Sequence, residues 1–144
     1  MLMAPNDRTA NLTPSVAWLL LSPIGRISRQ PYWLGFILVW IVILIAMRMW
    51  WTSLGPGTEL TELNLIHFME SNPLFPFLFF ALQWVELALV IKRCQDIGVT
   101  GFLALLIFVP FVNVVAVLIF GVIPGAQGAN RYGPMPNSYF RRSS

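Results

Sequence analysis

The fold is decided by residues 33–51, WLGFILVWIVILIAMRMWW. A helix needs about 20 mostly apolar residues to cross the hydrocarbon core of a bilayer, which is close to the length of this stretch. Its one charged residue, Arg48, lies near the end, where a long side chain can reach the membrane surface. The stretch therefore predicts a membrane-crossing helix.

Two further apolar runs follow, at residues 74–91 and 102–123. We therefore expect an all-α integral membrane protein with three crossings, arranged as a three-helix transmembrane bundle. Pro110 lies near the middle of the third run and leaves an alternative open, in which the chain turns back there. We favour the full crossing, because the two halves are short and proline is tolerated inside membrane helices.

The composition points to the same class of protein. The chain is 57% hydrophobic and 10% charged, whereas soluble domains have about 25% charged residues. The single cysteine, Cys94, excludes an internal disulfide and offers no metal-ligand spacing, so we expect no metal and no cofactor. The net charge of +3 comes from residues near the ends of the runs, which argues against a nucleic-acid partner.

The segments outside the runs define the domain boundaries. We expect one membrane domain at residues 14–136, preceded by a flexible N-terminus at 1–13 and followed by a flexible tail at 137–144. Residues 14–21 predict a short helix, which is too short to cross and should lie in the membrane interface.

Basic residues predict the orientation. The segment 52–73 has three glutamates and no lysine or arginine. By contrast, Arg26 and Arg29 precede the first run, and Lys92 and Arg93 follow the second. Basic residues stay on the cytoplasmic side, so the N-terminus and the loop 92–101 should be cytoplasmic and 52–73 external. A full third crossing then places the C-terminal tail outside, although its arginines oppose that placement.

Three polar residues fall within the runs. Gln83 and Asn113 lie near the centres of two runs, and we expect their amides to hydrogen-bond each other, although they could instead line a polar path. Glu86 lies roughly 7 Å below the inner boundary, at a rise of about 1.5 Å per residue. An intramembrane carboxylate is a functional candidate. The simpler account is a salt bridge to an arginine from the inner surface, namely Arg26, Arg29 or Arg93.

Four cations gather at the predicted inner edge. Arginine presents a planar fork that matches phosphate, so these residues are candidates for binding an anionic headgroup. The alternative is that they only set the topology and extend to the membrane surface. Asp96 should pair with Arg93 or cap the turn that follows. The four candidates are Arg26, Arg29, Lys92 and Arg93.

Three edge segments resemble the signature of Domain of Unknown Function family 805, small bacterial inner-membrane proteins. They read GRxxRxxYW at 25–33, RxxDxGxxG at 93–101 and PGxxGxNRYGP at 124–134. The resemblance covers about residues 18–136 and implies a helical protein of the bacterial inner membrane, with no established activity. Where the family usually has histidine before the aspartate, this chain has Gln95. The motif residues that we single out at turns are Asp96, Gly98, Asn130, Arg131 and Tyr132.

No motif names a reaction, and we do not expect an enzyme or catalytic residues. His67 stands alone on its loop and Cys94 has no histidine nearby in the sequence. We expect a multi-pass membrane protein that associates with membrane partners, as a homo- or hetero-oligomer, or with anionic lipid headgroups. The alternative is a transporter subunit that uses the intramembrane polar residues Gln83, Glu86 and Asn113.

Overall fold

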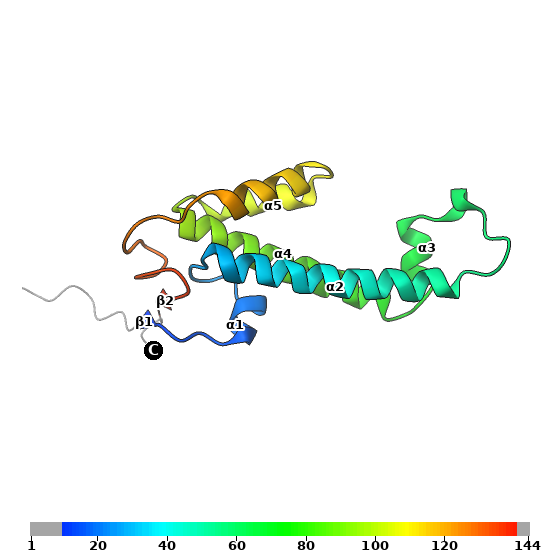
Figure 1. Ribbon diagram of the computed structural model, residues 1–144, viewed down its shortest axis with the longest axis horizontal. Coiled ribbons are helices and arrows are strands. Elements are labelled where there is room, and N and C mark those ends of the chain that lie inside the picture. Colours follow the sequence, from blue (N-terminus) through cyan, green and yellow to red (C-terminus); the bar gives the residue numbers. More distant parts are fainter. Residues whose placement is uncertain (1–9, 141–144) are drawn as a thin grey trace, which may run out of the picture.

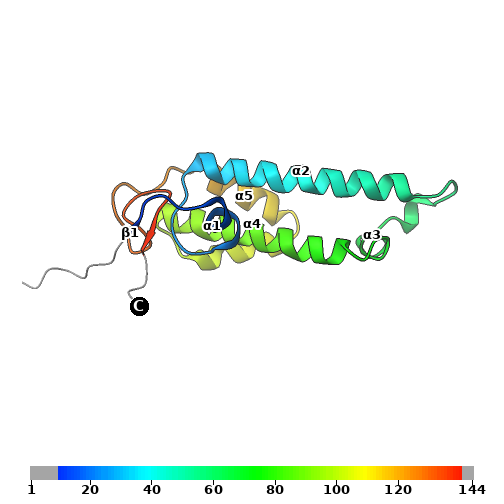
Figure 2. The ribbon, with the colours of Figure 1, turned by 90° about the horizontal axis from the view of Figure 1, so that it is seen from below.

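Two long helices lie side by side along the length of the molecule in the computed structural model, which describes residues 10–140 (Figures 1 and 2). They are α2 (Arg29–Ser53) and α4 (Phe75–Ile97). Both are long and apolar enough to cross a membrane, as the runs 33–51 and 74–91 predicted. Pro76 is accommodated in the first turn of α4, where a missing N–H costs little.

Short helices flank this pair. The predicted N-terminal helix is present as α1 (Val16–Leu21), and the side chain of Ser15 caps it by accepting from the Trp18 backbone N–H. Between α2 and α4 lie the 3₁₀ helix η1 (Leu60–Glu62) and the helix α3 (Leu65–Glu70). We call this side, with residues 54–74, the acidic end of the molecule; α1 and the first and last described residues lie toward the other side (Figure 1).

The third apolar run is not one helix, so the expectation of a single continuous helix over 102–123 is wrong. It forms the 3₁₀ helix η2 (Gly101–Phe108) and the helix α5 (Val112–Val122), which lie side by side as a hairpin (Figure 1). Phe111 adopts a left-handed φ of 64° directly after Pro110, which reverses the chain. Each arm is about 16 Å long, from rises of about 2.0 Å and 1.5 Å per residue, or half of a bilayer core of about 30 Å.

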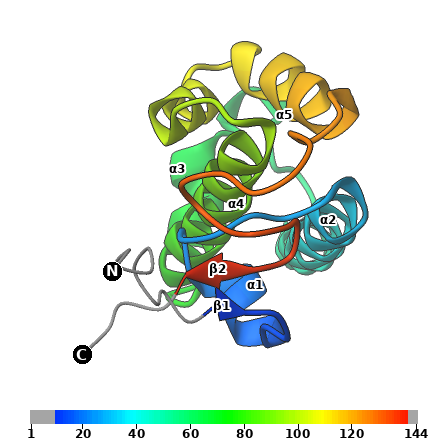
Figure 3. The same cartoon turned by 90° about the vertical axis from the view of Figure 1, so that its left-hand side faces the viewer.

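The fold extends beyond the boundaries that we expected. A short antiparallel pair joins β1 (Ala10–Asn11) to β2 (Tyr139–Phe140), and Ser138 is completely buried. Figure 3 shows the C-terminal segment passing across the end of α4, beside α1. Residues 10–13 and 137–140 therefore belong to the folded domain rather than to flexible ends. The rest of those predicted segments, 1–9 and 141–144, lies outside the described residues.

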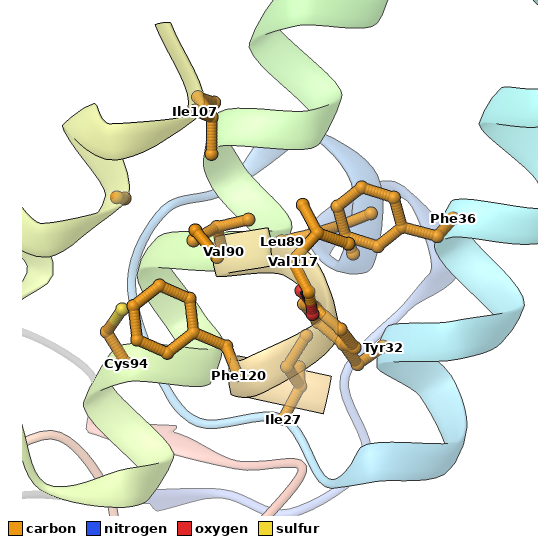
Figure 4. Packing of buried hydrophobic residues seen from close by; sticks show 11 residues of the cluster. Ile27, Tyr32, Phe36, Leu89, Val90, Cys94, Ile107, Val117 and Phe120 are labelled. Atoms are coloured by element: carbon orange, nitrogen blue, oxygen red, sulfur yellow. Dashed lines mark hydrogen bonds between the residues drawn. The ribbon is translucent and has the colours of Figure 1, made fainter. Parts of the chain in front are cut away.

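The main hydrophobic core lies where α2, α4 and the hairpin meet (Figure 4). Tyr32 and Phe36 of α2, with Leu89 and Val90 of α4, are almost completely buried there. Close approach requires glycine at Gly121, because a Cβ atom at this position would lie 2.2 Å from the Trp33 ring. We call this half of the molecule, with the three motif segments, the basic end.

The outer faces of the helices are apolar and exposed. Leu44 of α2 is 67% exposed, Phe77 of α4 is 75% exposed and Val122 of α5 is 67% exposed. A soluble monomer rarely exposes contiguous apolar patches of such extent. Exposed apolar side chains are favourable in contact with lipid, so these faces are suited to a membrane.

Candidate functional site

A buried carboxylate joins two arginines at the basic end. Asp96 accepts from Arg26 Nε at 3.0 Å and from Arg93 Nη1 at 2.6 Å. All three side chains are at most 1% exposed. The predicted pairing of Asp96 with Arg93 is confirmed, and Arg26 is a second partner. We call Arg26, Arg93 and Asp96 the arginine cluster.

Arg26 ties the C-terminal loop to the helices. Its guanidinium donates to the carbonyl oxygens of Ala126, Gly128 and Gly133, at 2.9, 2.6 and 3.2 Å. The loop 124–134 is therefore wrapped around one arginine. Gly125 permits this approach, since a Cβ atom there would lie 2.2 Å from Asp96 Oδ2.

Arg93 satisfies the free carbonyl end of α5. It donates to the carbonyls of Phe120, at 2.9 Å, and Ile123, and also to that of Ile27. The last carbonyls of a helix have no partner within it and carry partial negative charge, so a cation there is stabilising. Arg93 thus holds the returning arm of the hairpin against α4.

Lys92 binds the free carbonyls at the C-terminal end of α1. Its ammonium donates to the carbonyls of Trp18, Leu19 and Ser22 at 2.5–2.9 Å, and it lies 4.6 Å from the centre of the Trp18 ring. A six-residue helix is too short to be stable alone, so this cap anchors it to α4.

The predicted four-cation headgroup site is therefore wrong as a group. Arg26, Lys92 and Arg93 are completely buried and have protein partners, and only Arg29 of the four is exposed. Arg29 Nη1 donates to the Val122 carbonyl at 3.4 Å. Backbone carbonyls, many of them at the ends of α1 and α5, are partners of Arg26, Lys92 and Arg93, and residues far apart in the sequence give no signal for such contacts.

The motif turn residues hold the segments together. Gly98 ends α4 with a φ of 92°, which favours glycine. Asn130 donates to the Gln95 carbonyl at 2.9 Å, and the Gln95 side chain accepts from the Gly25 N–H at 3.1 Å. Gln95 thus links the three motifs. The sequence analysis noted it only as a departure from the family pattern.

Arg131 and Tyr132 stay at the surface and line a groove. Arg131 stacks on the Tyr132 ring, with its guanidinium carbon 4.7 Å from the ring centre. The groove has a volume of about 630 Å³ and runs between α4 and η2, where Leu87, Ile91 and Leu105 form its apolar wall. We call it the Arg131 groove. It combines one exposed cation with a hydrocarbon surface.

The intramembrane polar residues are not arranged as predicted. Gln83 donates to the Glu86 carboxylate at 3.4 Å, while Asn113 donates to the Ile107 carbonyl at 2.8 Å. The predicted pairing of Gln83 with Asn113 is therefore wrong. Glu86 makes no salt bridge within residues 10–140, so its predicted arginine pairing is wrong as well. Asn113 lies near the Glu86 carboxylate, and its side chain also bridges the turn of the hairpin.

Comparisons with known proteins identify the family of the chain. The family model described as "Protein of unknown function (DUF805)" matches residues 20–134. The chain belongs to the DUF805 family. Inner membrane protein YhaI of Escherichia coli (strain K12) is 32% identical over 112 residues, covering 78% of this chain and 83% of that protein. Inner membrane protein YhaH of the same strain is 30% identical over 118 residues, covering 78% and 84%. A search of solved structures found no match.

The DUF805 match includes the complete arginine cluster, Lys92 and the Arg131 groove. The names of the two relatives support an inner-membrane localisation for this family member. Neither name states an activity.

Proposed function

We propose that this DUF805 protein crosses the inner membrane twice and binds an anionic phospholipid in the Arg131 groove, at the cytoplasmic surface. In this arrangement α2 and α4 are the crossings, and the hairpin of η2 and α5 enters the bilayer halfway. The termini, the arginine cluster and the loop 124–134 share the cytoplasmic side.

A charge difference between the two ends supports this orientation. At the acidic end Glu59, Glu62 and Glu70 are exposed, and residues 52–73 contain no lysine or arginine. Among the described residues of the three motif segments, cations outnumber the one carboxylate, that of Asp96, which pairs with Arg26 and Arg93. Basic residues near crossings remain cytoplasmic. The described cations at that end are Arg26, Arg29, Lys92, Arg93 and Arg131.

The Arg131 groove is the observation that carries the binding proposal. Its apolar wall of Leu87, Ile91 and Leu105 suits an acyl chain, and Arg131 at its edge suits a phosphate. The groove lies where α4 ends, at the depth where a headgroup meets hydrocarbon. Anionic lipids of the cytoplasmic leaflet attract each nearby cation with about 1 kcal/mol.

Lipid retention tests the proposal. The full chain is purified in mild detergent, and bound phosphatidylglycerol is quantified by mass spectrometry for wild type, Arg131→Gln and Arg48→Gln. Arg48 is an exposed cation near the acidic end and serves as the matched control. We expect Arg131→Gln to lower retention at least fivefold and Arg48→Gln to leave it unchanged. Equal retention by wild type and Arg131→Gln would overturn the proposal.

A transporter subunit is the second candidate, supported by the half-buried Glu86 carboxylate, whose neighbours Gln83 and Asn113 are neutral amides. Vesicles with wild type or Glu86→Gln separate the two candidates. Proton or cation flux that needs Glu86 favours transport, whereas equal background flux in both favours lipid binding. Lipid retention in Glu86→Gln serves as the control for folding.

A further inference from the structure

A second cavity lies at the acidic end, far from the Arg131 groove. It has a volume of about 410 Å³ and lies between α2, α3 and α4, open on one side. Ligand sites in proteins have volumes of about 300–1,000 Å³, so this cavity has the size of a binding site. Its wall is almost entirely hydrocarbon, with Ala46, Trp50, Leu63, Phe75 and Phe79 among the lining residues.

Aromatic contacts keep the cavity from closing. Phe68 of α3 stacks on Phe75 of α4 with ring centres 4.6 Å apart, and it meets Trp50 of α2 edge-on at 5.3 Å. Trp50 Nε1 also donates to His67 Nδ1 at 3.3 Å. These contacts fix the position of α3 across the two long helices, so the space between them has a defined shape.

The position of the cavity along the two long helices indicates that lipid surrounds it. On α2 its lining runs from Ile43 to Trp50, the last two turns of the apolar run that predicts the first crossing. On α4 it begins at Phe75, the first residue of the second crossing. The cavity therefore opens to lipid at the level where acyl chains begin, and an acyl chain matches its hydrocarbon wall.

Acidic residues lie next in sequence to the segment that lines the cavity. Glu62 directly precedes the lining residue Leu63, and Glu70 ends α3, two residues after Phe68; both carboxylates are exposed. The cation nearest in sequence, Arg48, lies on another face of α2, because positions 43, 46, 47 and 50 share the lining face at helical spacing. Two carboxylates disfavour an anionic headgroup and favour one that carries an amine.

We propose that this cavity holds one acyl chain of a phospholipid whose headgroup bears a primary amine, with the amine near Glu62 and Glu70. Phosphatidylethanolamine is the probe, and phosphatidylglycerol is the comparison. This site is separate from the Arg131 groove in position and in the charge of its lipid. Either proposal can fail without the other.

Filling the cavity tests the proposal. The full chain is incorporated in nanodiscs with equal amounts of both lipids, and retained lipid is measured by native mass spectrometry after release into detergent. Ala46→Trp fills the cavity from a position that is 4% exposed, and Ile45→Trp adds the same ring at a position that is 55% exposed. Met47→Trp narrows the opening from a lining position that is 41% exposed, which covers the case in which Ala46→Trp does not fold.

We expect wild type and Ile45→Trp to retain one phosphatidylethanolamine, and Ala46→Trp and Met47→Trp to retain at least tenfold less. Glu62→Gln/Glu70→Gln should keep a lipid but lose the preference for phosphatidylethanolamine. Lipid retention at the wild-type level in both cavity variants would overturn the site. A wild-type dimer that the cavity variants abolish would overturn it as well. Equal retention of both lipids by wild type would overturn the amine selection.

Discussion

Asp96 accepts from Arg26 Nε at 3.0 Å across 70 residues of chain. This contact joins the segment before α2 to the last turn of α4. Because Arg26 also donates to three carbonyls of the loop 124–134, all three motif segments meet at the Arg26–Asp96 pair. The motifs that identify the family therefore build the fold of the basic end.

Replacing Asp96 with asparagine should destabilise the protein strongly. The amide is nearly the same size but leaves the buried charges of Arg26 and Arg93 without a counter-charge, and breaking a buried ion pair costs about 3–5 kcal/mol. Thermal unfolding in detergent measures the change. Glu59→Gln alters an exposed carboxylate outside both proposed lipid sites and should leave the melting temperature unchanged. Equal melting temperatures for wild type and Asp96→Asn would show that the cluster is not structural.

Gly125→Ala should also destabilise the basic end. The new methyl group would lie 2.2 Å from Asp96 Oδ2, so either the loop or the carboxylate must move, and overpacking costs about 1–3 kcal/mol. Gly55→Ala is the matched control, because no atom lies within 4 Å of a Cβ atom there. Denaturant titration of both variants measures the change, and a Gly125→Ala variant as stable as Gly55→Ala would contradict the geometry.

Lys92→Met should release α1 while the long helices remain folded. The substitution keeps an apolar stem of similar length but removes three hydrogen bonds to carbonyls, and a buried polar group without a partner costs about 1–3 kcal/mol. Hydrogen exchange should speed up at residues 16–22 and stay unchanged in the middle of α2. Unchanged exchange in α1 would mean that the cap does not anchor it.

Phe111→Gly should be tolerated or stabilising. Phe111 is 89% exposed and has a φ of 64°, where a bulky residue is strained by about 1–3 kcal/mol. Glycine adopts this conformation without a steric penalty, so the hairpin turn should gain stability. Phe102→Gly removes a ring that is 80% exposed at a position where φ is not positive, and serves as the control. A melting temperature that falls more in Phe111→Gly than in Phe102→Gly would contradict the turn.

The sequence predicted the two long helices because an uninterrupted apolar run of about 20 residues is typical of a membrane-crossing helix. It also predicted local features correctly, such as the short helix within residues 14–21 and the turn at Gly98. These features depend on neighbours in the chain, so the residues themselves carry the information.

Features that depend on distant contacts were harder to predict. Pro110 is compatible with a kinked crossing and with a turn, and the left-handed Phe111 that decides between them has no sequence signal. The buried roles of Arg26 and Lys92 depend on carbonyls brought close by folding. Gln83 and Asn113 were placed together by their depth in two crossings, which assumed a continuous third helix.

The turn at Pro110 is the central claim, since it places the C-terminal loop beside Arg26 and Asp96. The most direct measurement is the side of the membrane reached by reporters fused after Ser144. We predict that a fluorescent protein, active only in the cytoplasm, gives signal there, and that an exported phosphatase gives none. The same pair inserted at Gly55 should report the opposite side. Phosphatase activity after Ser144 without fluorescence would show a full third crossing and contradict the account.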